Sequence, residues 1–426
     1  MQQYKNPDIS EWATILKRPT FDFSEIVGRV QPILEAVKAR GDAAIFEFTE
    51  QFDQVKLDDL RVSEAEMLAA QEQVSEELKQ AISVAAQNIR TFHAAQKQPV
   101  LEVETMKGVR CWRKSVPIQR VGLYIPGGTA PLFSTILMLG IPAQEAGCQE
   151  IVFCSPPNKS GKIHPAILYT ASFLGIKNIF KVGGAQAIAA MAYGTESIPA
   201  AYKIFGPGNQ YVTIAKQLIS QVGIAIDMPA GPSEVAIFGD KTANAVFIAS
   251  DLLSQAEHGA DSQVLFVTTS EKLQQEVQEA VYEQLERLPR KELARISLKN
   301  SRNILVNDER AAIQLLNEYA AEHLILAIEN DEEVAEKIVN AGSIFLGHYT
   351  PESVGDYASG TNHTLPTNGF AKAFSGVSLD SFVKKITYQK LTREGLSNIG
   401  KTVEIMAAAE SLEAHKRAVS IRLAEN

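Results

Sequence analysis

Histidines with acidic or amide neighbours are concentrated in the second half of this 426-residue chain. Four of its seven histidines have such neighbours, in the segments Gln255–His258, Glu322–His323, Asp356–His363 and Glu410–His415. Imidazole, carboxylate and amide groups can bind a metal ion, and imidazole and carboxylate groups also exchange protons near neutral pH. The combination predicts an enzyme with a metal site beside acid/base groups.

The candidate metal ligands are Gln255, His258, Asp356 and His415. Gln255 and His258 are three positions apart and share one face if the segment after Asp251 is helical. Asp356 lies in a glycine-flanked segment, 354–360, which we expect to be a loop with room for a ligand. Two imidazoles and two oxygens suit zinc or a neighbouring first-row metal, although an amide ligand is uncommon. For each histidine alone, a hydrogen-bonded structural role is the alternative.

Glu322 and His323 are the candidate acid/base pair. They lie where the helical pattern of residues 310–320 gives way to the apolar run of residues 324–328, so we expect a helix-to-strand junction. Histidine can take a proton from an alcohol or a water, and the adjacent glutamate can activate water or orient the imidazole. The alternative is a solvated helix residue followed by a residue at the edge of a strand.

The three cysteines offer a rival mechanism, in which a thiolate attacks an aldehyde. Cys148 precedes the apolar run of residues 151–153 and Cys154 follows it, which favours small-residue roles at strand ends. We expect Cys111 to have a structural role as well. No Cys-x-x-Cys spacing is present, so a thiolate metal site is also disfavoured.

Alternating strands and helices must position these residues. Residues 23–52 and 63–95 have helical periodicity. From about Arg120, short β-branched runs are each followed by glycine and a helix-forming stretch, the pattern of βα units in a parallel sheet. The strands expected in this middle part are residues 121–125, 179–182 and 201–205. A nucleotide-binding domain is the natural interpretation.

A second α/β domain is expected after Ser233. Its predicted strands are residues 234–238, 264–268 and 343–346. From about Gly376 the chain has a helical pattern that ends in an alanine-rich stretch near residue 406. This tail has too little apolar surface to fold alone, so we expect it to pack elsewhere.

Glycine-rich turns follow the three strands of the middle part, at residues 126–129, 183–186 and 206–209. Glycine lets backbone N–H groups approach phosphate oxygens, and the amino terminus of the following helix favours negative charge. Tyr211 stands where the dinucleotide fingerprint requires its third glycine, so this is not a standard Rossmann fingerprint. The alternative for each turn alone is a glycine that merely permits a tight connection.

Composition narrows the partners and the compartment. The formal net charge of -9 and the absence of a basic tract argue against nucleic acid as a partner. Residues 1–8 lack the apolar core of a signal peptide, and no apolar run is long enough to span a bilayer. We therefore expect a cytoplasmic protein that does not bind membranes.

Taken together, the motifs closely resemble those of histidinol dehydrogenase, in order and over nearly the whole chain. The segments that carry the resemblance are Tyr124–Gly128, Val182–Ala190, Phe205–Asn209, Ala230–Glu234, Ser254–His258, Ala321–Leu324 and Gly360–Thr367.

The resemblance implies an intertwined homodimer with two incomplete Rossmann-like, aldehyde-dehydrogenase-like domains. The expected division is an N-terminal helical arm (1–20), a discontinuous domain with the metal and catalytic residues (21–119 and 233–375), an NAD-binding domain (120–232) and a helical tail (376–426). The tail would cross to the neighbouring subunit.

The resemblance also implies the chemistry, which is oxidation of L-histidinol to L-histidine through the aldehyde, with two NAD⁺ used in turn and one zinc ion per subunit. Zinc would act mainly as a template for the substrate, His323 would remove the hydroxyl proton, and Glu322 would activate water. By this similarity the zinc ligands are Gln255, His258, Asp356 and His415, which with Ser233, His323, His363 and Glu410 also contact substrate; Tyr124, Gln186 and Asn209 contact NAD. Another NAD-dependent alcohol or aldehyde dehydrogenase on the same scaffold, or a catalytically idle metal-binding relative, are the alternatives.

Overall fold

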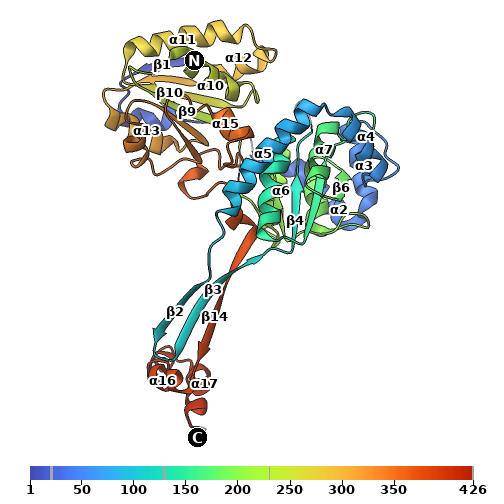
Figure 1. Cartoon of the computed structure of the whole chain (residues 1–426), viewed down its shortest axis with the longest axis vertical. Coiled ribbons are helices and arrows are strands. Elements are labelled where there is room, and N and C mark those ends of the chain that lie inside the picture. The colour runs from blue at the N-terminus through green and yellow to red at the C-terminus, as the bar shows by residue number, and fades with distance from the viewer. Residues whose placement is uncertain (20–22, 128–130, 230, 425–426) are drawn as a thin grey trace.

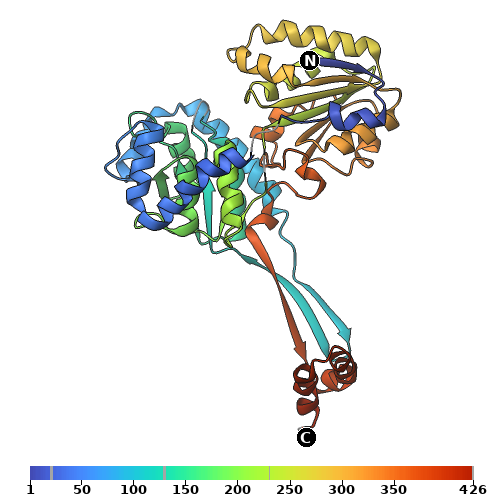
Figure 2. The ribbon, with the colours of Figure 1, turned by 180° about the vertical axis from the view of Figure 1, so that it is seen from behind.

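The computed structural model describes residues 1–19, 23–127, 131–229 and 231–424. Figures 1 and 2 show two lobes, each built around a sheet, and a long arm that projects from them and carries the C-terminus. We name the lobes after their sheets, which have five and six strands. All strand pairs within these two sheets are parallel, so the predicted α/β fold is confirmed.

The five-stranded lobe contains the βα units expected in the middle of the chain. Its sheet has the order β6-β5-β4-β7-β8. Strands β4, β5 and β6 extend the sheet in one direction and β7 and β8 in the other, so the order reverses between β4 and β7. The elements are β4 (Arg120–Tyr124), α6 (Ser134–Ala146), β5 (Glu150–Ser155), α7 (Pro165–Phe173), β6 (Asn178–Lys181), α8 (Gly184–Tyr193), β7 (Lys203–Phe205), α9 (Gln210–Ser220) and β8 (Ala225–Ile226).

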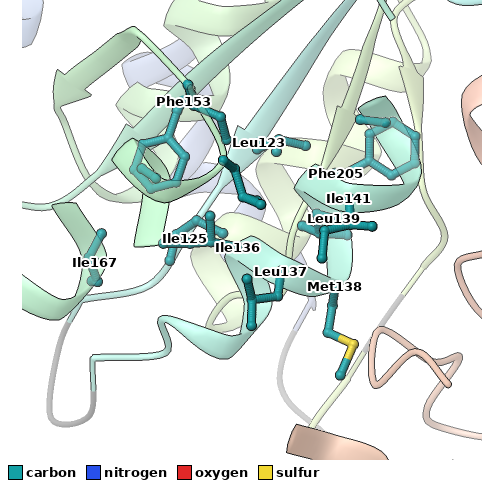
Figure 3. Packing of buried hydrophobic residues seen from close by; sticks show 14 of the residues in the cluster. Leu123, Ile125, Ile136, Leu137, Met138, Leu139, Ile141, Phe153, Ile167 and Phe205 are labelled. Atoms are coloured by element: carbon teal, nitrogen blue, oxygen red, sulfur yellow. The ribbon is translucent and has the colours of Figure 1, made fainter. Parts of the chain in front are cut away.

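One of the two buried clusters of this lobe lies between the sheet and α6, and the other lies between the sheet and helices α2, α8 and α9. Leu123, Phe153 and Phe205 of the sheet are fully buried and belong to the same cluster as Ile136 and Leu139 of α6 (Figure 3). The middle of α6 is apolar on all sides, since another helix, α5 (Glu76–Ala94), covers its outer face.

The helices between residues 23 and 94 also belong to the five-stranded lobe, which corrects the expected division of the chain. They are α2 (Phe23–Arg40), α3 (Asp42–Asp53), α4 (Glu64–Gln73) and α5. Helix α2 packs on α8 and α9, α3 on α8, and α4 on α7, whereas the expected division groups residues 21–119 with residues 233–375. The apolar faces of these helices were recognisable in the sequence, but their periodicity does not say which sheet they cover.

The six-stranded lobe has the strand order β1-β11-β10-β9-β12-β13. Strand β1 pairs with β11, so the first residues join this sheet instead of forming a separate helical arm. The order reverses between β9 and β12, as it does between β4 and β7 in the other lobe. The elements are β1 (Gln2–Lys5), α1 (Ile9–Ile15), β9 (Glu234–Gly239), α10 (Ala245–Ala256), β10 (Gln263–Thr268), α11 (Glu271–Leu285), α12 (Lys291–Lys299), β11 (Arg302–Leu305), α13 (Glu309–Tyr319), β12 (His323–Ala327), α14 (Asp331–Ala335), β13 (Ser343–Leu346) and α15 (Glu352–Tyr357).

The arm is a three-stranded antiparallel sheet capped by two helices. It consists of β2 (Leu101–Met106), β3 (Val109–Pro117), β14 (Val383–Leu391), α16 (Arg393–Ala409) and α17 (Glu413–Ala424); the short helices η1 (Phe370–Lys372) and η2 (Leu379–Phe382) precede β14. The tail expected to be helical thus includes a nine-residue strand, which forms because β3 lies beside it along its whole length. Among the described residues, no helix combines the length and apolar character needed to cross a membrane.

Candidate active site

Glu322 and His323 lie at the junction between α13 and β12, as the sequence predicts. Helix α13 ends at Tyr319, and Ala320 adopts a left-handed conformation with φ of 51° that turns the chain into β12. His323 is the first residue of that strand, and both side chains are buried. The pair therefore occupies the amino-terminal edge of the six-stranded sheet, near the start of β9.

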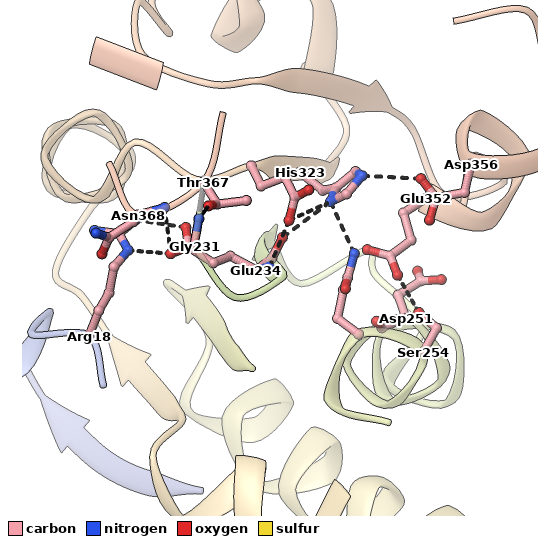
Figure 4. A network of polar contacts seen from close by, with 12 residues as sticks. Arg18, Gly231, Glu234, Asp251, Ser254, His323, Glu352, Asp356, Thr367 and Asn368 are labelled. Atoms are coloured by element: carbon pink, nitrogen blue, oxygen red, sulfur yellow. Dashed lines mark hydrogen bonds and ion pairs between the residues drawn. The ribbon is translucent and has the colours of Figure 1, made fainter. Parts of the chain in front are cut away.

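The imidazole of His323 is the centre of a polar network (Figure 4). Its Nδ1 lies 3.0 Å from Nε2 of Gln255 and 3.2 Å from the carbonyl oxygen of Glu234. Its Nε2 lies 3.2 Å from Oδ1 of Asp356. Residues from α10, β9, β12 and α15 thus meet at one ring.

Glu322 is held by the backbone and lies close to the ring. Its Oε2 accepts a hydrogen bond from the backbone N–H of Glu234 at 2.9 Å and lies 3.7 Å from Nδ1 of His323. Burial raises the pKa of Glu322, partly opposed by the charge of His323. Burial alone would lower the pKa of His323, but the charge of Glu322 and the contact with Asp356 outweigh it and raise that pKa. The site can therefore hold and move protons.

Three of the four expected metal ligands lie in this part of the structure. Gln255 is in the last turn of α10, and its buried Oε1 has no hydrogen-bond partner. The helix ends at Ala256, and a turn in which the N–H of His258 donates to the carbonyl of Gln255 at 3.2 Å carries the exposed His258 side chain. Gln255 is therefore in the helix and His258 lies just beyond its end, so the expectation that both share one helical face is only partly met.

Asp356 lies in the short helix α15 and not in a loop, which corrects that expectation. Glycine at position 355 is compatible with one turn of helix, and a Cβ there would meet the ring of Phe345 at 2.6 Å, so glycine allows α15 to pack closely. Desolvation would raise the pKa of Asp356, but the hydrogen bond from His323 and the charges of His323, His363 and His258 lower it. Asp356 is consequently a carboxylate among imidazoles.

Two of the expected substrate contacts border this network. Nδ1 of His363 lies 2.8 Å from the carbonyl oxygen of Asp356, and its Nε2 lies 3.0 Å from Oγ1 of Thr135 in α6. His363 therefore bridges the two lobes at the site. Ser233 directly precedes β9, where its carbonyl accepts from the N–H of Gln263 at 3.3 Å.

Glu410 and His415 are not brought to the network by this chain. Glu410 caps the end of α16 and His415 lies in α17, both exposed at the far end of the arm (Figure 1). Among the described residues, no three His, Cys, Asp or Glu side chains are arranged to hold a metal ion. Of the four expected ligands, Gln255 is an amide and His415 lies on the arm, so a single chain does not bring all four together.

Gln255, His258 and Asp356 nevertheless fit a metal ion in their chemistry. A buried amide oxygen without a hydrogen-bond partner is costly unless a ligand or ion engages it. The lowered pKa of Asp356 keeps the neighbouring carboxylate anionic, as a metal ligand must be. Nitrogen and oxygen donors of this kind suit zinc.

The three residues expected to contact NAD lie together at the carboxyl edge of the five-stranded sheet. Tyr124 ends β4, Gln186 is in the first turn of α8 after β6, and Asn209 caps α9 after β7. The hydroxyl of Tyr124 accepts a hydrogen bond from the N–H of Gly184 at 3.2 Å. Ligands of open α/β sheets bind at this edge where the strand order reverses, here between β4 and β7.

Backbone packing explains the glycine in one of the three glycine-rich turns. Gly206 has φ of +130°, and a Cβ at this position would lie 2.0 Å from the carbonyl oxygen of Tyr124. The close approach of β7 to β4 therefore requires glycine there. For this turn, the alternative that glycine merely permits a tight connection is sufficient. Residues 128–130, in the turn after β4, and Ala230 lie outside the described residues.

Cys148 and Cys154 do not offer a nucleophile. Cys154 is fully buried in β5, and burial raises its pKa. Burial also raises the pKa of Cys148 to about 11. Both stay protonated near neutral pH, so the expected structural roles at strand ends are favoured by their surroundings.

Sequence reasoning missed the charged groups that support the network. Glu234 is buried and pairs with Arg18 at 2.5 Å between Oε1 and Nε, and Arg18 also lies over the ring of Tyr319. Glu352 is buried and accepts a hydrogen bond from Oγ of Ser254 at 2.5 Å, while its Oε2 has no partner. The one usable signal in the sequence was that Glu234 directly follows Ser233, an expected substrate contact. Arg18 is far away in sequence, so its pairing with Glu234 could not be predicted.

A cavity of about 490 Å³ lies at the opposite, carboxyl edge of the six-stranded sheet. Asp240, Lys241, Ser270 and Asp308 are among its lining residues. None of the expected site residues lines it, and Asp240 and Asp308 accept hydrogen bonds from backbone N–H groups of their own turns. The cavity is therefore separate from the His323 network.

Comparison with known proteins connects this geometry to one family. The family model described as histidinol dehydrogenase matches residues 16–423. Histidinol dehydrogenase of Bacteroides thetaiotaomicron is 59% identical over 99% of both chains, and that of Escherichia coli K12 is 52% identical over 96% of this chain and 94% of the other. A crystal structure of histidinol dehydrogenase from Elizabethkingia anophelis matches with a TM-score of 0.97 and 57% identity, covering 99% of this chain and 98% of that one.

Proposed function

This chain belongs to the histidinol dehydrogenase family and oxidises histidinol in histidine biosynthesis, and we propose that it does so with NAD⁺ and zinc at the His323 network. The reaction would convert L-histidinol to L-histidine through the aldehyde, with two hydrides transferred to two NAD⁺ in turn. The observation that carries this assignment is the buried contact of His323 with Gln255 and Asp356, beside Glu322.

The zinc ligands would be Gln255, His258 and Asp356 of one chain and His415 of a second copy. The unpartnered Oε1 of Gln255 and the anionic Asp356 support this set. When bound, zinc would supply a template that orients the amino and imidazole nitrogens of histidinol. Ser233, His363 and Glu410 would complete the substrate contacts.

His323 would take the proton of the substrate hydroxyl. Its Nε2 now bonds to Asp356, and that nitrogen would instead face the alcohol once Asp356 serves as a ligand. In the tautomer that leaves Nε2 free to take this proton, Nδ1–H would donate to the carbonyl of Glu234, which defines the orientation of the ring. When bound, NAD⁺ would supply the hydride acceptor for this step.

Glu322 would activate the water that hydrates the aldehyde before the second oxidation. Burial raises its pKa, which makes its carboxylate a stronger base than an exposed glutamate. The N–H of Glu234 fixes one carboxylate oxygen and leaves the other for water. The alcohol and hydration steps thus use two different bases of one network.

NAD⁺ would bind at the carboxyl edge of the five-stranded sheet through Tyr124, Gln186 and Asn209. The amino terminus of α8 lies at this edge, where backbone N–H groups favour phosphate. The bridge from His363 to Thr135 in α6 joins this lobe to the His323 network. Cofactor and substrate held by different lobes would meet between them.

A second copy of the chain would complete each site. The exposed positions of Glu410 and His415 at the end of the arm support exchange of the tail between subunits. Ile405, Met406 and Ile421 on the same two helices, and Leu412 in the connection between them, expose large apolar side chains, as expected of a surface that packs on a partner. We propose a homodimer with shared sites. The three free cysteines suit a reducing compartment, and we propose the cytoplasm.

The stoichiometry of the reaction tests the assignment. We expect two NADH per histidinol consumed, loss of activity after treatment with a chelator, and recovery with zinc. One NADH per histidinol would point to the alternative, a simple alcohol dehydrogenase on this scaffold. Full activity in a metal-free preparation, verified by elemental analysis, would contradict the zinc proposal while leaving the NAD proposal intact.

A further inference from the structure

Asp53 ends helix α3 at the same edge of the five-stranded lobe as Tyr124. Helix α3 begins at Asp42, whose carboxylate accepts hydrogen bonds from the hydroxyls of Thr195 and Ser197, beyond the C-terminal end of α8. Since α3 packs against α8, its other end lies near the start of α8. There Gly184 donates to the hydroxyl of Tyr124. Asp53 is therefore carried to the edge where NAD⁺ is proposed to bind.

The chain that follows Asp53 crosses this edge of the sheet. A Cβ at Gly161, in the loop after β5, would lie 3.1 Å from Leu57 and 3.6 Å from Val55. Further on, the carbonyl of Leu60 accepts from the N–H of Lys181 in β6 at 2.7 Å. The segment is thus packed on the carboxyl ends of β5 and β6, which defines the position of Asp53.

One carboxylate oxygen of Asp53 has no protein partner. Its Oδ2 is buried without a hydrogen bond, and no cation among the described residues forms an ion pair with it. Burial raises the pKa of Asp53 to about 6, and its charge is felt at Tyr124. The group is still ionised at pH 8. A buried carboxylate oxygen without a donor is costly, so we expect a function that keeps Asp53 there.

Other polar groups at this edge also lack partners. Ser155, at the end of β5, is fully buried with an unpartnered hydroxyl, and Gln210, the first residue of α9, has an unpartnered amide oxygen. Asp53, Ser155 and Gln210 thus offer three unmet hydrogen-bonding groups at the edge where a ligand with hydroxyl groups would bind.

We propose that Asp53 determines the cofactor specificity of this enzyme by accepting a hydrogen bond from a ribose hydroxyl of NAD⁺ and repelling the 2′-phosphate of NADP⁺. Acidic side chains recognise ribose hydroxyls in this way in other dinucleotide sites, and like charges disfavour the phosphorylated analogue. The inference rests on the proposed use of NAD⁺ and adds a specificity residue to it.

Calorimetric titration of the zinc-loaded enzyme with NAD⁺ and NADP⁺ tests this role. The wild type should bind NAD⁺ more tightly than NADP⁺. Asp53→Asn should weaken NAD⁺ binding about tenfold and lower the preference for NAD⁺ over NADP⁺ at least tenfold, because the phosphate is no longer repelled. Asp53→Ala should shift the preference in the same direction. Asp58→Asn, an exposed neighbour, is the matched control and should bind both nucleotides like the wild type.

The outcomes separate this inference from the function on which it rests. Unchanged affinities for both nucleotides in Asp53→Asn, with NAD⁺ still bound by the wild type, would overturn the role of Asp53 alone. Equal weakening of both nucleotides would also overturn it, because a merely structural change does not discriminate against a phosphate. A wild type that binds neither nucleotide would overturn the NAD proposal itself.

Discussion

His323 receives contacts from three side chains that play different parts in the proposed chemistry. Gln255 holds its Nδ1 side, Asp356 its Nε2 side, and Glu322 lies 3.7 Å away. Buried groups of opposite charge alter one another's proton affinity strongly, because little water screens them. At the scale of single residues, the protein thus supplies a coupled set of proton carriers and not one isolated base.

Glu322→Gln should separate the two oxidation steps. The glutamine oxygen can still accept from the N–H of Glu234, so we expect the fold to be retained, whereas a base for water activation is lost. Oxidation of the aldehyde should fall by about 10²-fold or more, and oxidation of the alcohol by less. Rates measured separately with histidinol and histidinaldehyde check this. Equal losses for both substrates would contradict a specific role in hydration; Glu332→Gln, on the exposed surface, is the control.

Asp53→Asn should stabilise the protein at neutral pH. The folded pKa of Asp53, about 6, lies above the ordinary aspartate value of 3.8, so the penalty for its ionisation is absent below the lower value and complete above the higher one. The variant lacks this penalty and should gain about 1–2 kcal/mol at pH 8 but almost nothing at pH 4. Urea unfolding at both pH values measures the difference. A gain that does not grow with pH would show that ionisation of Asp53 is not its cause.

At the scale of elements, α10 and α15 are linked beside the site. Ser254 in α10 donates to Glu352 in α15, and each of these helices also carries a candidate metal ligand, Gln255 and Asp356. Ser254 directly precedes Gln255, while Glu352 lies one helical turn before Asp356. Their hydrogen bond therefore restricts how far the two ligands can move apart.

The buried pair of Arg18 and Glu234 connects the segment after α1 to the start of β9. Arg18→Ala would leave Glu234, whose side chain is only 3% exposed, without its cation. We expect a loss of about 3–5 kcal/mol in the free energy of unfolding. The exposed pair of Arg295 and Glu286 provides the contrast, since Arg295→Ala should cost less than about 1 kcal/mol. Similar losses in the two variants, measured by urea unfolding, would argue against the structural importance of the buried pair.

At the scale of the whole molecule, hydrogen bonds near the His323 network join the two lobes, whereas the arm projects away from them. Nδ2 of Asn362 donates to the carbonyl of Met138 in α6, and Nδ2 of Asn88 in α5 donates to the carbonyl of Ala358. Together with the bridge from His363 to Thr135, these bonds hold the six-stranded lobe's site against the helices of the other lobe. The arm has no such contact with the site in one chain, as Figures 1 and 2 show.

Mixing two inactive chains tests whether sites are shared. Glu322→Gln and His415→Asn homodimers should each be nearly inactive in histidine formation. If the tail is exchanged, a heterodimer regenerates one intact site, and random association after mixing should restore about a quarter of the wild-type activity. Subunit exchange is verified with differently tagged chains. Heterodimers that form without any recovery would show that His415 serves the site of its own chain.

Much of the secondary structure could be predicted from local sequence. The β-branched runs near residues 121, 179, 234, 264 and 343 correspond to β4, β6, β9, β10 and β13 within one or two residues. Strands β4, β6, β9 and β10 are largely buried on both faces, which makes them continuous apolar runs that stand out locally. Strand β14 was not predicted, because it depends on pairing with β3 more than 250 residues earlier in the chain.

The sequence by itself determined the family, the α/β class and the residue types of the site, since motifs and periodicity are properties of short segments. Only the tertiary structure decided which of these residues meet. It places Gln255, Glu322, His323 and Asp356 in one network and leaves Glu410 and His415 on a distant arm. It also places helices α2 to α5 in the five-stranded lobe and leaves one carboxylate oxygen of Asp53 without a hydrogen-bond partner. The physical reason is that contacts between distant segments depend on which apolar surfaces pack together in three dimensions. Periodicity identifies the apolar face of a helix but not the surface on which that face packs.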